Sequence, residues 1–381
     1  MELTPSILTY IEAHQEEAYQ LLLTLAQIPA PSNHEEERAA FCKDWLDAQG
    51  STGVYTDEAL NVVYPVGDTG ENPLLVVMAH SDVVFPDTTP LPLEIRDGRI
   101  YCPGVMDDTA NAVALLIAAK YIAETGLQPK GTGLLLVVNA GEEGLGNLKG
   151  CRKIMETYGS RVREFISFDD KNCNGVHNAV GSRRYRVEVT TEGGHSFRDF
   201  GRPNAIACLS ALITDLNAMK IPRLGRTTFN VGTIQGGTSI NTIAAQAEMT
   251  YEYRSDDRDC LAQMRQQFHI LVENSNTSQV HFEVELLGER PCGGEVDPQA
   301  LEQLLTRCSQ AVKLVTGTTP APCSLSTDAN LPLSLGVPAT TVGLYQGAGE
   351  HTREEYVLLD SLSPGLAIAL SLLLPSFDGP T

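Results

Sequence analysis

The chain has 381 residues, enough for two domains, and its 42% hydrophobic and 20% charged content is typical of soluble globular proteins. The formal net charge of -21 argues against nucleic-acid and anionic-membrane partners, because both require a basic face. The longest apolar stretch near the end, 365–374, is shorter than the ~20 residues that span a bilayer. We therefore expect neither nucleic acid nor a membrane as a partner.

The cysteines and the N-terminus indicate a reducing compartment. The chain has 9 cysteines, an odd number, scattered from Cys42 to Cys323 with no Cys-x-x-Cys pair. This pattern suits reduced thiols better than a disulfide framework or a structural zinc site. The first residues lack the basic-then-apolar layout of a signal peptide. The sequence therefore predicts a cytoplasmic protein.

The chain begins with two predicted helices. Residues 6–28 have the pattern of an amphipathic helix that ends at Pro29 and Pro31. Ser32 and Glu35 then predict a capping box for a second helix that ends at Gly50. His34 lies inside that box, so we interpret it as structural. Strand-like pieces follow over 53–65.

Residues 74–82 predict a buried strand with chemistry at its end. The run is apolar without alternation, as in a strand buried on both faces of a parallel sheet. It ends on His80, with Asp82 two places later. In open α/β sheets, ligands bind at the carboxyl ends of strands. A lone histidine here is more often satisfied by a backbone carbonyl, but His80 is not alone.

Other apolar segments are also followed by polar residues. Asp107 stands just before the apolar stretch 110–124, which predicts a buried helix, and three strand-like runs lead to acidic or histidine residues: 133–138 to Glu142 and Glu143, 165–168 to Asp169, and 337–344 to His351. Each could be a surface turn or a cap if taken singly. Together, the histidines and carboxylates at element ends predict a metal site.

The pattern changes after Gly181. The following segments alternate between predicted strands (183–190, 227–234, 244–254 and 280–287) and predicted helices (204–220 and 257–274). The order β-α-β-β-α-β is that of a ferredoxin-like module. A helix over 301–316 and a buried strand over 337–344 then resume the earlier pattern. The final apolar stretch predicts a core helix with Ser363 as N-cap and Pro364 at its first position.

These motifs resemble the M20 metallopeptidases, two-zinc amidohydrolases that include tripeptidases, dipeptidases, carboxypeptidases and N-acyl-amino-acid deacylases. The motifs that carry the resemblance are His80-Ser81-Asp82, 104–108, Glu142-Glu143-Gly144, Asp169, and His351-Thr352 with Glu354-Glu355. Segments 326–330 and 349–355 look most like the peptidase T-like branch.

The resemblance implies an α/β fold in two parts. It implies a two-zinc exopeptidase-type domain with a mostly parallel sheet flanked by helices, formed by residues 1–181 and 291–381. An inserted ferredoxin-like α+β domain, 182–290, would serve as the lid and dimerisation domain. The expected assembly is a homodimer formed through that domain.

The resemblance also assigns the metal ligands. His80 and Asp169 would bind one metal, Glu143 and His351 the other, and Asp107 would bridge both. Imidazole and carboxylate ligands suit two zinc ions per subunit, with cobalt or manganese as alternatives. The family further implies a cis peptide bond between Asp107 and Asp108.

Two carboxylates beside the ligands have expected roles in catalysis. Glu142, next to a ligand, is the natural general base. It would take a proton from the water that bridges the two metals, which becomes the attacking hydroxide, and pass that proton to the leaving amine. Asp82 would orient His80.

Three residues of the inserted domain are implied in substrate binding. By resemblance, His195, Asn241 and Arg254 hold the substrate's carbonyl oxygen and carboxylate, with His195 reaching across a dimer. The alternative is that they are turn and strand-end residues with local hydrogen bonds. The chain departs from the family pattern at Thr109, where lysine is common, and at Asp170, where glycine is frequent; 103–105 also lacks a common arginine. None of these changes removes a ligand.

The predicted function is hydrolysis of an amide bond in di- or tripeptides. An N-acyl-amino-acid deacylase with the same site is the nearest alternative. A catalytically inactive binding protein is a second alternative, against which the intact Glu142 and the full ligand set argue.

Overall fold

The computed structural model describes residues 3–171 and 175–378. The chain divides into two compact units, Met1–Ala179 with Gly294–Thr381 and Val180–Gly293, here called the α/β unit and the inserted unit. Within the described ranges, no helix combines the length and apolar character that crossing a membrane requires.

The α/β unit is built on an eight-stranded sheet. Its strands, in spatial order, are β1 (Tyr55–Thr56), β2 (Val62–Val66), β6 (Gly133–Asn139), β3 (Leu74–His80), β7 (Val162–Phe168), β16 (Ala339–Val342), β8 (Gly175–Ala179) and β15 (Pro322–Leu325). The central strands β6, β3, β7 and β16 run parallel, whereas β2 is antiparallel to β6. The expected mostly parallel sheet is confirmed.

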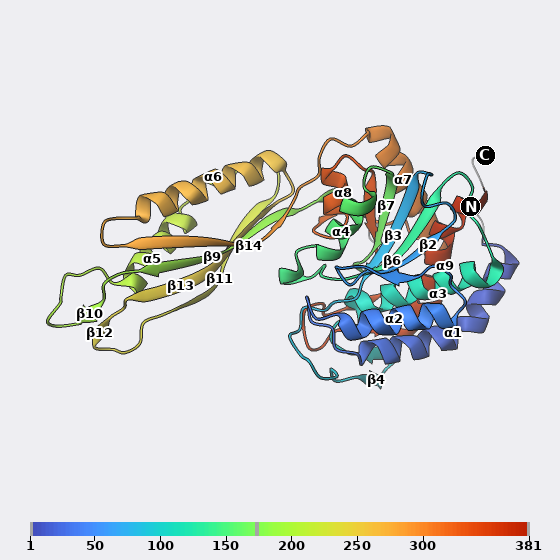
Figure 1. Cartoon of the computed structure of the whole chain (residues 1–381), viewed down its shortest axis with the longest axis horizontal. Helices are drawn as coiled ribbons and strands as arrows, with labels where there is room; N and C mark the ends of the chain where they lie inside the picture. The colour runs from blue at the N-terminus through green and yellow to red at the C-terminus, as the bar shows by residue number, and fades with distance from the viewer. Residues whose placement is uncertain (1–2, 172–174, 379–381) are drawn as a thin grey trace. The chain divides into compact units, whose positions relative to one another are not determined.

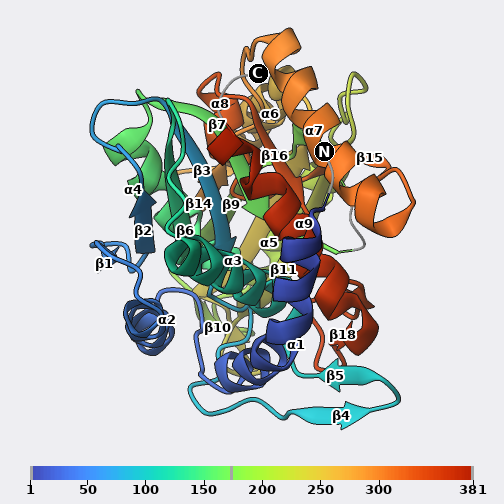
Figure 2. The same cartoon turned by 90° about the vertical axis from the view of Figure 1, so that its right-hand side faces the viewer.

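Helices cover both faces of this sheet. The helices of the unit are α1 (Pro5–Ala26), α2 (Glu36–Ala48), α3 (Asn111–Thr125), α4 (Lys149–Tyr158), α7 (Pro298–Thr316), α8 (Asn330–Ser334), α9 (Leu362–Leu373) and α10 (Pro375–Asp378). Alternate residues of β3 enter two different cores. Leu75 and Val77 pack with α1, α3 and α9, while Val76 and Met78 pack with α4 and α8. Figure 2 shows α1, α3 and α9 together on one face. The unbroken apolar run of β3 follows from burial on both faces.

The predicted capping box at the start of α2 is wrong. The N-cap residue is Glu35, and no side chain caps the helix. The Ser32 hydroxyl instead donates to Asp82, at 2.7 Å, and Glu35 accepts from the backbone N–H of Asn33 at 2.8 Å and from Lys149 at 3.0 Å. The Ser32 side chain is therefore directed toward the tertiary structure, where its hydroxyl donates to a carboxylate, and not toward the backbone N–H groups of α2, which it would accept in a capping box.

The last core helix also begins earlier than predicted. Helix α9 starts at Leu362 with Ser361 as N-cap, so that Pro364 is its third residue. The first N–H groups of a helix have no intrahelical acceptor, so a proline at this position removes no helical hydrogen bond.

A second sheet of the unit was not predicted. It has four short strands, β17 (Gly347–Ala348), β18 (Tyr356–Leu358), β5 (Arg99–Tyr101) and β4 (Glu94–Arg96). Strands of two or three residues carry too little periodicity to be recognised in sequence.

The inserted unit has the predicted β-α-β-β-α-β order. Its main elements are β9 (Gly181–Thr190), α5 (Ala205–Asn217), β11 (Thr227–Gly236), β13 (Gln246–Ser255), α6 (Arg258–Ser275) and β14 (His281–Arg290). The antiparallel sheet has the order β11-β13-β9-β14, with β11 at one edge (Figure 1). Tyr185, Tyr251 and Phe268 form its aromatic centre with side chains of α5 and α6.

Candidate metal centre

The carboxyl ends of three adjacent parallel strands meet at one place. His80 is the last residue of β3, and Asn139, the last of β6, stands opposite it. Asp169 follows directly after β7, on the other side of β3. The strands therefore bring together polar residues that are far apart in sequence, at the edge where open α/β sheets bind ligands.

Asp107 lies between the two predicted metal-binding histidines. Its Oδ1 is 3.1 Å from Nε2 of His80, and its Oδ2 is 3.2 Å from Nε2 of His351. The same Nε2 of His351 is 3.1 Å from Oε1 of Glu143. One carboxylate thus faces a different histidine with each oxygen, which is the arrangement expected of a ligand shared by two metal ions.

The segment that carries Asp107 is an irregular helical turn, η1 (Val105–Ala110), which leads into α3. The peptide bond between Asp107 and Asp108 is cis, as the resemblance implied. Neither residue has helical backbone angles.

His80 is oriented mainly by a backbone carbonyl. Its Nδ1 is 3.0 Å from the carbonyl oxygen of Asp82, and 3.5 Å from Oδ1 of the same residue. An Nδ1–H that donates to a carbonyl leaves Nε2 as the nitrogen available to a metal ion. The sequence predicts that the Asp82 carboxylate orients His80. In the structure the carboxylate is the more distant of the two Asp82 groups near Nδ1, and the backbone carbonyl is the closer one.

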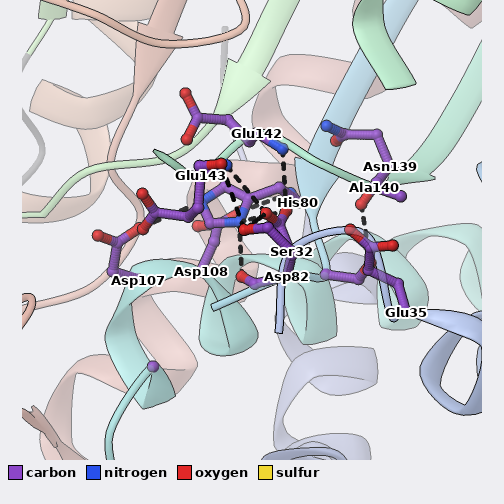
Figure 3. Close-up of polar contacts among 12 residues, drawn as sticks. Ser32, Glu35, His80, Asp82, Asp107, Asp108, Asn139, Ala140, Glu142 and Glu143 are labelled. Carbon is purple, nitrogen blue, oxygen red and sulfur yellow. Dashed lines mark hydrogen bonds and ion pairs between the residues drawn. The ribbon is translucent and has the colours of Figure 1, made fainter. Parts of the chain in front are cut away.

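The Asp82 carboxylate has closer partners on the turn that carries Glu142 and Glu143. It accepts the backbone N–H of each at 2.9 Å, in addition to the hydroxyl of Ser32 (Figure 3). Asp82 is fully buried, and these hydrogen bonds fix the turn beside the end of β3.

The described residues form two groups of potential metal ligands, and within each group the ligand atoms all lie within 4.8 Å of one another. One is formed by His80, Asp107 and Glu143, and the other by His80, Asp108 and Asp169. Asp108 was given no role from sequence. Its Oδ2 accepts the backbone N–H of His80 at 2.8 Å, and its Oδ1 accepts from the Asn111 amide at 2.5 Å. These bonds indicate that Asp108 supports the strand end.

The electrostatics of the cluster follow from packing carboxylates and imidazoles together away from water. Burial opposes the ionisation of Asp107, but hydrogen bonds from His351 and His80 hold its pKa well below the ordinary value. The same hydrogen bonds to Asp107 and Glu143 raise the pKa of His351 to about 10. Burial, with the charges of Asp107 and Glu142, raises the pKa of Glu143 to about 7.

The pKa of Asp169, the third predicted carboxylate ligand, is shifted in the opposite direction to that of Asp107. Burial raises the pKa of Asp169 well above its usual range, and the charges of Asp107 and Glu142 raise it further. Buried carboxylates close to one another are unfavourable when ionised, and bound divalent cations would stabilise their ionised forms.

The Glu142 side chain lies beside this cluster. Its charge raises the pKa of both Glu143 and Asp169, after the larger effect of burial. Figure 3 shows the carboxyl groups of Glu142, Glu143 and Asp107 on the same side of the site. The residue itself is 4% exposed.

Two supporting residues were missed or misread in the sequence. The spacing of Ser32 and Glu35 predicts a helix cap, whereas the Ser32 hydroxyl donates to Asp82. Arg38, a buried guanidinium, donates to the carbonyl of Ser81 at 2.7 Å and to the hydroxyl of Thr109 at 3.2 Å. An arginine inside a helix gives no sequence signal of such a role.

Within the inserted unit, His195 and Asn241 are neighbours. His195 lies in the short strand β10 (Gly194–His195), which pairs with β12 (Thr242–Ile243), and the backbone N–H of Ser196 donates to the carbonyl of Asn241 at 3.0 Å. Nδ1 of His195 accepts the backbone N–H of Phe197 at 3.2 Å. The ring proton is therefore on Nε2, which makes that atom a donor.

Arg254 is not brought to the same place. It lies near the far end of β13, opposite Ser182, and its guanidinium contacts Glu252 at 3.1 Å. Gln246, at the other end of β13, is about 27 Å from Arg254 along the strand, and β12, which pairs with the strand that carries His195, ends just before Gln246. His195 and Arg254 therefore lie toward opposite ends of β13.

The sequence is similar to a family of peptidases and to a deacetylase. Residues 76–374 match the model of peptidase family M20/M25/M40. An acetylornithine deacetylase from Myxococcus xanthus is 27% identical over 321 residues, which are 80% of this chain and 81% of that protein.

Solved structures resemble the chain along nearly its whole length. A tripeptidase from Staphylococcus aureus has a TM-score of 0.75 at 21% identity, covering 96% of this chain and 99% of that one. A dipeptidase from Saccharomyces cerevisiae has a TM-score of 0.76 at 16% identity, covering 99% of both. At these identities the likeness is one of fold.

Proposed function

The chain belongs to peptidase family M20/M25/M40, and we propose that it is a two-metal exopeptidase that hydrolyses the amide bond of di- or tripeptides. The expected family and the class of metal-dependent hydrolase are confirmed. The observation that supports the proposal most directly is the Asp107 carboxylate between Nε2 of His80 and Nε2 of His351.

The donor set fits two divalent cations. His80 and Asp169 would hold one ion and Glu143 and His351 the other, with Asp107 contacting both. Imidazole and carboxylate donors suit zinc, and cobalt and manganese accept the same ligands. When bound, such a pair of ions supplies Lewis-acid activation of a water molecule and of the substrate carbonyl.

Glu142 would transfer the proton. Its backbone is fixed by Asp82, and its side chain is not among the assigned ligands, so the carboxylate can accept a proton from the attacking water and return it to the leaving amine. Asp82, through the two backbone N–H groups that it accepts, would hold Glu142 and Glu143 at the distance that this transfer requires.

A homodimer would complete the substrate site. Nε2 of His195 is a donor suited to the substrate's carbonyl oxygen, and Arg254 is suited to a carboxylate. Because Arg254 lies about 27 Å along β13 from Gln246, and His195 lies in the separate β10–β12 pair that precedes Gln246, we infer that a site that uses both takes them from different subunits. The edge strand β11, exposed along most of its length, and the exposed Phe197 and Ile240 offer the surface for such pairing.

The related deacetylase favours a second candidate function, removal of an N-acyl group from an amino acid at the same site. Both reactions break an amide bond, and they differ in whether the substrate has a free amino group. A cytoplasmic location is also proposed, in keeping with eight free cysteines among the described residues.

A panel of matched substrates tests the proposal. Each di- or tripeptide is assayed in its free and N-acetylated form, with zinc and after chelation. If the protein is an exopeptidase, it should cleave the free peptides in a metal-dependent reaction. Cleavage of the acetyl group alone would favour the deacylase, and a metal-loaded protein that cleaves neither would indicate a binding protein.

A further inference from the structure

Glu355 holds the segment that carries Asp107. Its carboxyl oxygens accept the backbone N–H groups of Gly104 at 2.9 Å, Met106 at 2.9 Å and Asp107 at 3.0 Å. We propose that Glu355 is a positioning residue that fixes the Asp107 carboxylate between the two metal ions. The inference rests on the proposed function, in which Asp107 contacts both ions.

The segment needs an acceptor of this kind because its backbone is irregular. Gly104 has a φ of 76°, and Asp107 has φ -110° and ψ 84°, so helical hydrogen bonds do not satisfy these N–H groups. A buried N–H without a partner costs about 1–3 kcal/mol. Glu355, itself 1% exposed, supplies the acceptors for three of them. The backbone conformation of the segment therefore depends on this one side chain.

Close packing restricts the segment from another direction. A Cβ atom placed on Gly104 would lie 2.2 Å from Cγ1 of Val83, which follows the end of β3. The position of the segment is thus restricted by contacts with both Val83 and Glu355.

Glu355 also joins this segment to the one that carries His351. Its backbone carbonyl accepts the N–H of Cys102 at 3.1 Å, and β18 begins at the next residue. Since His351 is only four residues earlier, Glu355 sets the separation between the Asp107 and His351 segments, which are far apart in sequence. The 3.2 Å contact between His351 Nε2 and Asp107 Oδ2 is the result of that arrangement.

The substitution Glu355→Gln tests this role with little change in size. One acceptor oxygen becomes an NH₂ group, which faces a backbone N–H, so two donors meet. Loss of a residue that supports metal ligands typically costs ~10–100-fold in metal affinity or activity. Glu354→Gln is the matched control, because Glu354 is the adjacent glutamate and its side chain is 81% exposed.

The measurement is cobalt substitution. Metal-free wild type, E355Q and E354Q are titrated with Co²⁺, whose visible spectrum reports the ligand geometry, and kcat and KM are then measured. We expect E355Q to show an altered spectrum, ~10–100-fold weaker binding of at least one equivalent and a lower kcat, with E354Q like wild type. A wild-type spectrum and affinity in E355Q would overturn the proposal.

A second measurement needs no variant and covers the case in which E355Q does not fold. In chelator-treated wild type, the amides of Gly104, Met106 and Asp107 should exchange slowly with deuterium, because Glu355 accepts them before any metal binds. Rapid exchange would overturn the proposal. The cobalt spectrum, the metal affinity and the amide exchange are all measured without peptide cleavage, so normal metal binding without hydrolysis would count against the proposed function alone.

Discussion

The backbone N–H of Glu143 donates to Oδ2 of Asp82 at 2.9 Å, which joins the turn after β6 to the end of β3. Both a proposed ligand, Glu143, and the proposed general base, Glu142, depend on this buried carboxylate, although it binds no metal itself in the proposed site. The position of the turn that carries Glu142 and Glu143 is therefore set by a residue that follows another strand.

Replacing this carboxylate should separate positioning from metal binding. In Asp82→Asn, an amide NH₂ group would face one of the backbone N–H groups. We expect the free energy of unfolding to decrease by about 1–3 kcal/mol and kcat to fall by ~10–100-fold. Denaturant unfolding and kcat provide the measurements. Asp87→Asn, at an exposed ion pair with Arg353, is the control, and an Asp82→Asn variant with wild-type kcat would exclude the positioning role.

The general base makes a sharper prediction. Glu142→Gln should keep two metal ions per subunit and lose ~10²–10⁴-fold or more in kcat, because only proton transfer is removed. Metal analysis beside kinetics provides the measurement. Glu156→Gln, on the exposed side of α4, is a control of the same chemistry. Near-wild-type turnover in a metal-replete Glu142→Gln protein would remove this residue from the mechanism.

The proposed bridging role of Asp107 predicts unequal effects of ligand removal. Asp107→Ala should weaken both metal sites, since its two oxygens face different histidines, whereas His351→Ala should weaken mainly one. Metal titration of each variant measures this difference. Tight binding of two equivalents by Asp107→Ala would show that the carboxylate does not bridge.

Protons and metal ions should compete at the site. In the metal-free protein the pKa of His351 is raised to about 10 and that of Glu143 to about 7. A raised folded-state pKa contributes stability that is complete below the unfolded-state value and is lost as pH rises through the folded-state value. Both groups therefore predict that the metal-free protein becomes less stable between about pH 5 and pH 10, with Glu143 acting in the lower part of this range and His351 in the upper part.

Metal binding must displace these protons, so metal affinity should increase over the same pH range. Thermal unfolding at several pH values, with chelator and with zinc, measures both trends. We expect Tm in chelator to fall with pH and the gain from zinc to grow. The His351→Gln protein should show a shallower fall. A chelated wild type whose Tm is constant or rises with pH would contradict the prediction.

The sequence predicted the elements whose patterns are long and the residues at their ends. The buried run of β3 predicted that His80 would stand at a site, and β7 did the same for Asp169. The supporting residues could not be predicted in this way. Ser32 and Glu355 act through contacts with segments far away in the sequence, and only the folded chain shows which backbone N–H groups need an acceptor.

Local motifs were misleading where a tertiary partner was stronger. Ser32 and Glu35 have the spacing of a capping box, yet their side chains turn to Asp82 and Lys149. A hydroxyl gains more from a buried carboxylate than from a backbone N–H at an exposed helix end. Such competition is invisible to any rule based on spacing along the chain.

The final prediction concerns the donor on the inserted unit. The backbone N–H of His195 donates to Asp199 at 2.8 Å, and its Nδ1 accepts from Phe197, so the ring is held with Nε2–H as donor. If this donor serves the partner subunit's site, His195→Ala should lower kcat by ~10²–10³-fold. His281→Ala, at an exposed position of β14, is the control.

Mixing two inactive variants tests whether the donor acts across subunits. Homodimers of His195→Ala and of Glu142→Gln should each be nearly inactive. A heterodimer has one site that combines the intact Glu142 of one subunit with the intact His195 of the other, so up to half of wild-type activity should return in it. The two proteins, carrying different tags, are re-equilibrated, the heterodimer is isolated and its kcat is measured. An inactive heterodimer would mean that His195 acts within its own subunit or has no part in catalysis.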